Sequence, residues 1–114
     1  MCLTTWLENM AIVDAQIHLY NKGDARPPHR PAPYTVEDAI REMDKAGVDA
    51  AIVHPPASWD PDSNEQAIAA AEAYPDRFAI FGYPPLDRPD SPEIIANWKK
   101  KPGMRGLRFY FGSP

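Results

Sequence analysis

Short apolar runs alternate along this chain with segments of helical periodicity. The apolar runs are rich in β-branched and aromatic residues and have the length of buried strands; they are residues 12–19, 49–54, 77–83 and 104–111. The segments between them place apolar residues three and four positions apart, as amphipathic helices do; they are residues 35–46, 63–74 and 91–101. This order is typical of parallel strands joined by right-handed crossovers. We therefore expect an α/β fold with one parallel sheet.

The predicted helices carry recognisable end signals. Thr35, followed three residues later by Asp38, predicts an N-cap, and Gly47 predicts the end of the same helix. Ser63 and Gln66 have the spacing of a capping box at the start of the second helix. The positions expected to face the core are Val36, Ala39, Ile40, Met43 and Ala46 in the first helix, and Ala67, Ala70, Ala71 and Tyr74 in the second.

The connections are of two kinds. Those that leave the strands are long and contain most of the 14 prolines, whereas those that leave the helices are short. Long loops at the carboxyl ends of parallel strands, with short loops at the opposite end, are the layout of a (β/α)-barrel enzyme. An open doubly wound sheet is the alternative fold, although no glycine-rich phosphate loop follows the first strand.

Composition narrows the class of protein. The chain has 114 residues, of which 44% are hydrophobic and 25% charged, as in ordinary globular domains. A net charge of −4 argues against nucleic acid as a partner, and the basic run Lys99–Lys101 is expected at a helix end, where cations complement the dipole. No apolar run is long enough to span a membrane, and residues 1–9 resemble an N-terminal extension rather than a signal peptide. The single cysteine, Cys2, fits a reducing compartment, so we expect a cytoplasmic protein.

Polar residues interrupt the apolar pattern where the first strand is expected to end. Asp14, Gln16 and His18 share one face if side chains alternate strictly. Polar groups near the carboxyl end of a parallel strand are the usual position of catalytic residues. His54 ends the second strand in the same way. An edge strand that exposes a polar face to water is the alternative interpretation of the first strand, and a satisfied core histidine is the alternative for His18.

The fourth predicted strand carries a cation among apolar residues. Arg108 shares a face with Gly106 and Tyr110. Burying a cation is costly unless it is paired, so we expect Arg108 to meet an anion, with a substrate carboxylate as the best fit for its planar guanidinium. For His29, Arg30 and Trp59, which lie in predicted loops, we expect structural roles.

Two of these segments resemble a known family. Residues 12–19, Ile-Val-Asp-Ala-Gln-Ile-His-Leu, resemble the first strand of the amidohydrolase superfamily, in particular its amidohydrolase-related branch of lactonases and nonoxidative decarboxylases. Residues 106–110, Gly-Leu-Arg-Phe-Tyr, are similar to the Gly-Val/Leu-Arg segment of the lactonase-like members. A complete (β/α)8 barrel takes roughly 250 residues. The resemblance therefore implies that residues 10–114 are the N-terminal half of a TIM barrel, strands one to four.

The resemblance also implies roles for individual residues. His18 matches the second histidine of the family's His-x-His metal ligands, whereas Gln16 replaces the first and argues against Zn²⁺, since an amide oxygen is a poorer ligand for this ion than imidazole. His18 and Asp14 are the catalytic candidates, with Asp14 either in a supporting position or hydrogen-bonded to the backbone in a structural role. Gln16, His54, Arg108 and Tyr110 are the candidates for binding substrate. The family's later histidines and its catalytic aspartate have no counterpart in this sequence.

The function implied is hydrolysis of a carboxylate-bearing lactone, ester or amide by the intact enzyme. His18, with or without a divalent metal, would polarise the carbonyl, and Arg108 would hold the acid. Nonoxidative decarboxylation is the alternative within the family. A different class of function is a non-catalytic chain that associates through open sheet edges. We expect a small-molecule partner, no measurable hydrolysis by the half-barrel alone, and association with a second copy or with a missing C-terminal half.

Overall fold

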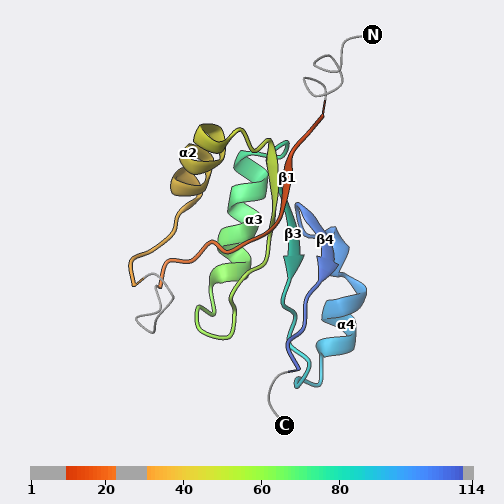
Figure 1. Cartoon of the computed structure of the whole chain (residues 1–114). Coiled ribbons are helices and arrows are strands. Elements are labelled where there is room, and N and C mark those ends of the chain that lie inside the picture. The colour runs from red at the N-terminus through yellow and green to blue at the C-terminus, as the bar shows by residue number, and fades with distance from the viewer. Residues whose placement is uncertain (1–9, 23–30, 112–114) are drawn as a thin grey trace.

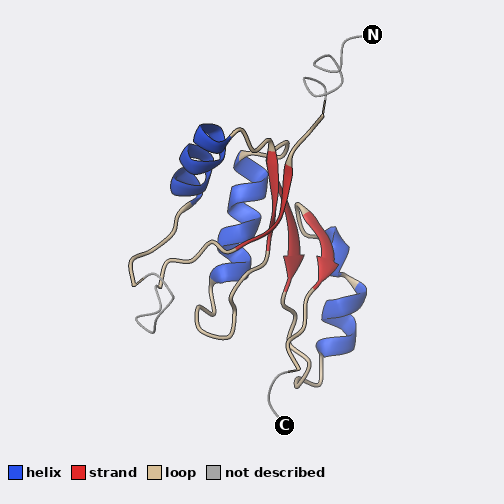
Figure 2. Ribbon diagram, in the orientation of Figure 1, coloured by secondary structure: helices blue, strands red, loops and turns tan. Residues whose placement is uncertain are grey.

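The computed structural model describes residues 10–22 and 31–111. Four parallel strands form one sheet in the order β1-β2-β3-β4 (Figure 1), which confirms the predicted α/β class and topology. The strands are β1 (Val13–Ile17), β2 (Ala50–Val53), β3 (Phe78–Gly82) and β4 (Met104–Leu107). The helices are α2 (Val36–Ala46), α3 (Ser63–Ala73), α4 (Ser91–Ala96) and the 3-10 helix η1 (Trp98–Lys100), shown with the strands in Figure 2. The predicted N-terminal extension, Cys2, His29 and Arg30 lie outside the described residues.

One face of the sheet is buried beneath the helices. The register pairs Val53 with Ile80 and Ile80 with Met104, and all three side chains are buried. Phe78 is also buried, with a ring 6.3 Å from that of Tyr74 at the end of α3. Ile80 and Phe78 therefore face the helices and do not lie on the open face of the sheet. Parallel strands with helical crossovers bury their largest apolar side chains against the helices first.

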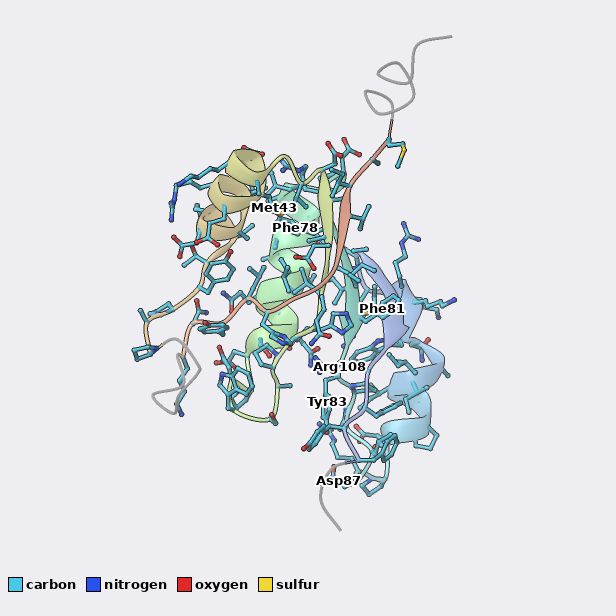
Figure 3. The ribbon with its side chains drawn as sticks, viewed as in Figure 1. Met43, Phe78, Phe81, Tyr83, Asp87 and Arg108 are labelled. Atoms are coloured by element: carbon cyan, nitrogen blue, oxygen red, sulfur yellow. The ribbon has the colours of Figure 1, made fainter. Side chains whose placement is uncertain are left out.

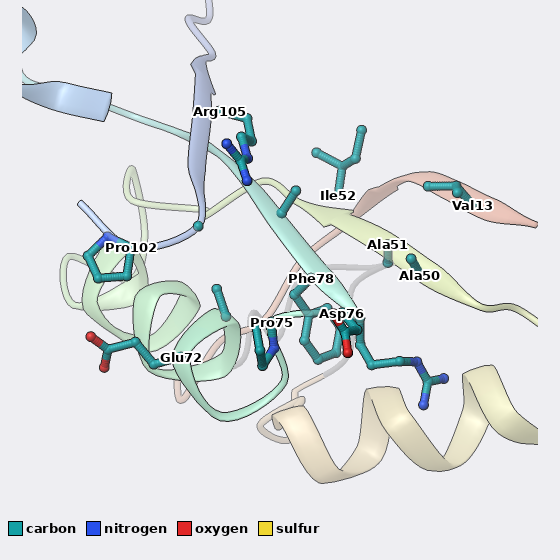
Figure 4. Close-up of a pocket in the computed structure, with 14 residues that line it drawn as sticks. Val13, Ala50, Ala51, Ile52, Glu72, Pro75, Asp76, Phe78, Pro102 and Arg105 are labelled. Carbon is teal, nitrogen blue, oxygen red and sulfur yellow. The ribbon is translucent and has the colours of Figure 1, made fainter. Parts of the chain in front are cut away.

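The opposite face of the sheet is open. Ile52 pairs with Ala79, and both are half-buried. Figure 4 shows Ile52 and Phe78 on opposite sides of the sheet. This open face is the one that a barrel would enclose, but the described strands form an open sheet with β1 and β4 as its edges. Within the described part of the chain, no helix has the length and apolar character needed to cross a membrane.

Helix α2 forms as its sequence predicts. The Thr35 hydroxyl accepts a hydrogen bond from the Asp38 backbone N–H, and the Asp38 carboxylate accepts one from the Thr35 backbone N–H. This capping box satisfies donors that the first turn leaves unpaired. Gly47 ends the helix in the left-handed conformation, with φ of 73°. Ala39 and Met43 are buried as expected, but Ala46 is exposed because the helix ends there.

Helix α3 differs in detail from the prediction. It begins at Ser63 itself, Asp62 occupies the N-cap position, and no side chain caps the helix. The predicted Ser63–Gln66 capping box is therefore wrong, since Ser63 already has helical geometry and its side chain is fully buried. The small residues of its inner stripe are buried as expected: Ala67, Ala70 and Ala71. Tyr74 follows the helix and is 37% exposed, because the chain turns at Pro75.

The third helical segment is divided into α4 and η1. The predicted lysine run therefore lies in and after a 3-10 turn, not in the last turn of an α-helix. Trp98 anchors this segment in the core with 3% exposure, and its indole N–H donates to the Gly106 carbonyl at 3.1 Å. The Lys101 ammonium lies 4.3 Å from the centre of the Trp98 ring, a cation–π contact.

Among the described residues, the two glycines with positive φ allow a test of packing that is independent of function. Gly47 and Gly103 have φ near 73° and 72°, but a Cβ at Gly103 would lie 2.4 Å from the Ala71 Cβ, whereas Gly47 has open space around it. Gly47→Ala should lower the free energy of unfolding by roughly 1–2 kcal/mol, the cost of the left-handed conformation. Gly103→Ala should cost about 1–3 kcal/mol more, because α3 and β4 must also separate. Urea unfolding of both variants measures the difference, and equal losses would contradict this packing.

The edges of the sheet expose apolar side chains, so we expect the 114-residue chain to associate with a second copy. Val13 of β1 is 53% exposed and Leu107 of β4 is 39% exposed. Sedimentation velocity at micromolar concentration should show species heavier than the 12.8 kDa monomer. Val13→Lys and Leu107→Lys should shift the distribution towards monomer. Leu86→Lys is the matched control, since Leu86 is 55% exposed but lies away from both edges. A wild-type chain that sediments as a stable monomer would contradict the expectation.

Candidate functional site

The candidate residues meet at the end of the sheet where the strands finish. A hollow of about 480 Å³ opens there, and His18, Arg108 and Tyr110 line it together with the loop after β2. Its lining residues are His18, the run Pro55–Trp59, Tyr83, Arg108 and Tyr110. Figure 3 shows Phe81, Arg108 and Tyr83 one after another towards this end of the sheet. The long loops that leave the strands supply the rest of the wall, as the sequence predicted.

Both edge strands carry an irregularity just before their site residue. In β1, Asp14 pairs with Ala51 and Ile17 with Val53, so β1 has one more residue than β2 in this interval. Ala51 and Val53 are buried, which places Asp14 and Ile17 in register with the helix-covered face. His18, which follows Ile17, therefore has the orientation of the open face.

This register corrects the prediction of strict alternation along β1. Asp14 and His18 do not share a face, because the extra residue between them reverses the alternation. The Asp14 carboxylate accepts a hydrogen bond from the Gln16 backbone N–H at 2.9 Å, and Asp14 does not line the hollow. The structure thus gives Asp14 the contact with the backbone that was one of its two expected roles.

An extra residue in β4 likewise determines the orientation of Arg108, which follows this strand. Met104 pairs with the buried Ile80, whereas Gly106 pairs with Phe81, which is half-buried. Without the shift, Gly106 would share the buried face of Met104, and so would Arg108. The extra residue transfers Gly106 and Arg108 to the open face, where His18 lies.

His18 is held in one tautomer by its contacts. Its Nδ1 lies 2.6 Å from the carbonyl oxygen of His54, which can only accept, so Nδ1 carries the proton. The Nε2 atom is then a lone-pair acceptor, and the Gln16 side-chain amide donates to it at 3.3 Å. His18 therefore presents a basic nitrogen near the hollow, with Gln16 as its neighbour.

His54 is 9% exposed and neutral in this arrangement. Its Nε2–H donates to the Ala15 carbonyl at 3.0 Å, while its buried Nδ1 has no hydrogen-bond partner among the described residues. Burial lowers the pKa of His54 below 6.5, the bond to Ala15 opposes this change, and the charges of Arg108 and His18 add to the lowering. His54 does not line the hollow, so its predicted contact with substrate is replaced by a contact with β1.

Arg108 is a half-buried cation at the hollow. Its backbone N–H donates to the Gly82 carbonyl at 2.9 Å, which fixes the start of the side chain beside β3. No carboxylate among the described residues forms an ion pair with its guanidinium. Tyr110 also lines the hollow and is 72% exposed. The guanidinium of Arg108 and the phenol of Tyr110 thus lie at the same end of the sheet, where both can bind an anion.

Two buried contacts hold the loops that form the wall. The Asp60 carboxylate, 4% exposed, accepts hydrogen bonds from the backbone N–H groups of Asn21 and Lys22 at 2.8 and 3.2 Å. It therefore joins the loop after β2 to the loop after β1. The Asn64 side chain binds both backbone groups of Tyr83, at 3.0 and 3.2 Å. It therefore fixes the loop after β3 to the start of α3.

Sequence reasoning missed several residues of the wall. Trp59 was expected to have only a structural role, but it lines the hollow with its ring 6.3 Å from that of His18. Tyr83 and Asp60 were not singled out at all. Trp59 and Asp60 follow a Pro-Pro pair directly after His54, and this position at the carboxyl end of a strand was a signal that could have identified them.

A second hollow lies at the opposite end of the strands (Figure 4). It has a volume of about 350 Å³ and contains Val13, Ile52 and Arg105, together with the short loops that precede β3 and β4. Arg105 lies in β4, lines this hollow and is exposed, whereas Arg108 directly follows β4. The two arginines thus line different hollows, which makes Arg105 a matched control for Arg108.

The described residues fit a metal site poorly. His18 offers one imidazole nitrogen, and its neighbour Gln16 directs an amide N–H to it. Across residues 10–22 and 31–111, no three His, Cys, Asp or Glu side chains are grouped so that they could hold a metal ion. A stable Zn²⁺ site takes three or four protein ligands, more than the described residues bring together.

The lowered pKa of His54 predicts a pH dependence of stability. In the unfolded chain His54 binds a proton near pH 6.5, whereas in the folded chain it binds one only at lower pH. The stabilisation is therefore complete above about pH 6.5 and is lost as the pH falls from there towards the folded pKa.

The variant for this test is His54→Gln, which cannot titrate and keeps an amide donor at the position of the imidazole Nε2–H. Urea unfolding between about pH 7.5 and 5.5 should show a steeper loss of stability for wild type than for this variant. Parallel pH profiles would contradict the assignment of a buried neutral His54.

Comparison with known proteins gives a likeness in fold. No family model matches the sequence, and no curated protein matches it. Among solved structures, a probable 2-pyrone-4,6-dicarboxylic acid hydrolase from Acinetobacter baumannii, crystallised with citric acid bound, is similar with a TM-score of 0.66 and 20% sequence identity. The match covers 88% of this chain but only 38% of that chain. The described part of this chain therefore has the fold of a segment that is little more than a third of that protein's length.

Proposed function

We propose that this chain forms one side of the substrate site of a hydrolase that acts on carboxylate-bearing lactones or esters. The observation that carries the proposal is that Arg108 and His18 line the same hollow at the carboxyl ends of the strands. One offers a positive charge, and the other offers a basic nitrogen. This is the pair of functions needed to bind an acid and to act on a bond beside it.

Arg108 would bind the carboxylate of the substrate. A half-buried guanidinium without an ion-pair partner among the described residues is costly, and a bidentate carboxylate offsets this cost. The solved structure with a similar fold supports this choice of ligand, because citric acid, which carries carboxylates, is bound in it. Its name also describes a hydrolase of a dicarboxylic acid with a pyrone ring.

His18 would act through Nε2. Since Nδ1–H is bonded to the His54 carbonyl, the neutral ring can accept a proton from a water molecule or from a tetrahedral intermediate, but it cannot donate one to a carbonyl oxygen. The role predicted from sequence, polarising the carbonyl, would require the imidazolium form. The Gln16 amide can rotate to offer its oxygen to that form, so Gln16 can accompany a change in the charge of His18.

The walls of the hollow favour a compact substrate with apolar faces. Pro55, Pro56 and Trp59 lie on one side, and Tyr83 contributes a further ring. The Trp59 ring is edge-on to His18, and the Tyr83 ring lies 6.4 Å from that of Phe109. A lactone ring that carries a carboxylate would place its apolar faces against these side chains and its anion at Arg108.

The 114-residue chain supplies part of such a site. It spans 38% of the hydrolase that it resembles in fold, and its sheet is open on the face that carries His18 and Arg108. We therefore expect this chain alone to bind carboxylates without measurable turnover. A protein that joins this sequence to further barrel strands should release acid from a carboxylate-bearing lactone, and His18→Asn should abolish the release. Loss of carbon dioxide in place of hydrolysis would favour the decarboxylase alternative.

Binding of citrate to the 114-residue chain tests the Arg108 assignment. Arg108→Gln removes a charge-assisted, bidentate contact worth about 1.5–3 kcal/mol, so the dissociation constant should rise roughly 10-fold to 100-fold. Arg108→Lys should give a smaller loss, since the charge remains but the planar fork does not. Isothermal titration calorimetry at fixed salt measures these changes.

The control for this measurement is Arg105→Gln. Like Arg108→Gln, this variant removes one positive charge from the segment of β4 and its following residue. Arg105, however, lines the hollow at the opposite end of the sheet. Its citrate affinity should stay within about twofold of wild type after the small effect of net charge. Equal losses in the two variants would show that citrate responds to total charge and would contradict a specific site at Arg108.

A further inference from the structure

We propose that His54 is a positioning residue, which secures the irregular segment of β1 and thereby holds His18 with its Nε2 lone pair available at the hollow. His54 does not line the hollow, so it acts through β1 and His18 and does not touch a ligand. The consequence for catalysis rests on the proposed function, but the state of the His18 ring can be measured without any substrate.

The first step of the argument is the register of β1. Between Asp14 and Ile17 the strand advances three positions, while β2 advances two, from Ala51 to Val53. Ala15 and Gln16 consequently have no paired residue on β2. A strand irregularity of this kind leaves backbone groups without their ladder partners, so a donor from elsewhere in the fold can pair with them.

His54 donates hydrogen bonds on both sides of the irregularity. Its side-chain Nε2–H donates to the carbonyl of Ala15, which has no paired residue, at 3.0 Å, and its backbone N–H makes the regular ladder bond to the Ile17 carbonyl at 2.8 Å. The ring and the backbone of His54 together span the extra residue, and Gln16 lies between the two anchored positions. The Phe81 ring, 5.5 Å away and close to perpendicular, supports the imidazole from β3.

The second step is the return contact from His18. Its Nδ1–H donates to the His54 carbonyl at 2.6 Å, which fixes the ring direction and the tautomer together. His54 thus donates to β1 with its ring and its backbone N–H, and accepts from β1 with its carbonyl. Loss of the ring contact would release Ala15 and Gln16, and the segment that carries His18 would no longer be anchored on that side.

The buried nitrogen of His54 explains why a histidine suits this position. With Nε2–H directed at Ala15, the Nδ1 lone pair is buried without a partner among the described residues. The ring is therefore a donor with one defined direction, whereas a flexible amide could rotate. The hydrogen bond between the rigid His54 ring and the Ala15 carbonyl therefore restricts Gln16 and His18 to one arrangement.

The test uses the nitrogen resonances of the histidine rings in the isolated 114-residue chain. Long-range ¹⁵N–¹H spectra distinguish a protonated Nδ1 from a protonated Nε2. In wild type, His18 should be the Nδ1–H tautomer and His54 the Nε2–H tautomer. In His54→Asn, whose amide is too short to reach Ala15, the His18 ring should show a mixture of tautomers. In His54→Gln, whose amide nitrogen matches the position of Nε2, the His18 tautomer should be largely restored.

Phe81→Leu is the control for packing. It removes the ring beside His54 but leaves every hydrogen bond of His54 to β1 in place. Its His18 tautomer should match wild type, and an equal change in Phe81→Leu and His54→Asn would overturn the proposal in favour of a packing role. An unchanged Nδ1–H tautomer in folded His54→Asn would overturn it as well. If His54→Asn does not fold, failure of His54→Gln to retain the tautomer is the overturning result.

A second measurement separates this inference from the proposed function. Citrate affinity should be nearly unchanged in His54→Asn, because Arg108 follows a different strand, β4, and binds the anion by itself. Loss of the His18 tautomer with retained citrate binding would leave the carboxylate site standing and confirm the positioning role. Loss of citrate binding in Arg108→Gln has no bearing on the His18 ring. The carboxylate site at Arg108 and the positioning role of His54 can therefore be contradicted independently of each other.

Discussion

The contact on which the site depends is the hydrogen bond between the His18 ring and the His54 carbonyl, at 2.6 Å. It joins the ends of β1 and β2 at the point where the ladder between them is irregular. Because a carbonyl can only accept, this bond determines which nitrogen of His18 is basic. The bond from the His54 ring to Ala15 anchors the preceding residue in return. A backbone requirement, that buried polar groups be paired, thus determines the chemistry that a side chain can offer.

Much of the fold could be predicted from the sequence because it depends on periodicity. Apolar runs and amphipathic segments gave the order of the elements, and Thr35 and Gly47 marked the ends of α2 correctly. The ends of the strands were predicted less well: β4 stops at Leu107, although apolar residues continue to Phe111. Hydrophobicity identifies residues that can form a strand, but pairing decides where the strand stops. The likeness to a solved hydrolase structure agrees with the predicted fold class, while closure into a barrel stays a prediction.

The site was harder to predict than the fold, since it depends on contacts between loops. His18 and Arg108 were named from sequence as site candidates and lie in one hollow, whereas Trp59 was expected to be structural and Tyr83 was not singled out. Their positions follow from Asp60 and Asn64, whose side chains bind backbone groups 38 to 39 and 19 residues away. No local pattern reveals such long-range partners. A buried carboxylate that joins two loops looks in sequence like any surface aspartate.

The irregularities of the two edge strands bring His18 and Arg108 to one face of the sheet, and the sequence pattern does not contain this reason. Strict alternation places Asp14, Gln16 and His18 together, and it places Gly106 and Arg108 on the face of Met104. The register instead puts Asp14 with the buried positions of β2 and Met104 with the buried Ile80. One extra residue in each edge strand then reverses the alternation before His18 and before Arg108. An insertion of this kind changes which face a side chain occupies without changing the apolar pattern on which prediction relies. Deleting one residue from either segment would return His18 or Arg108 to the helix-covered face, where a charged or polar side chain would displace the core.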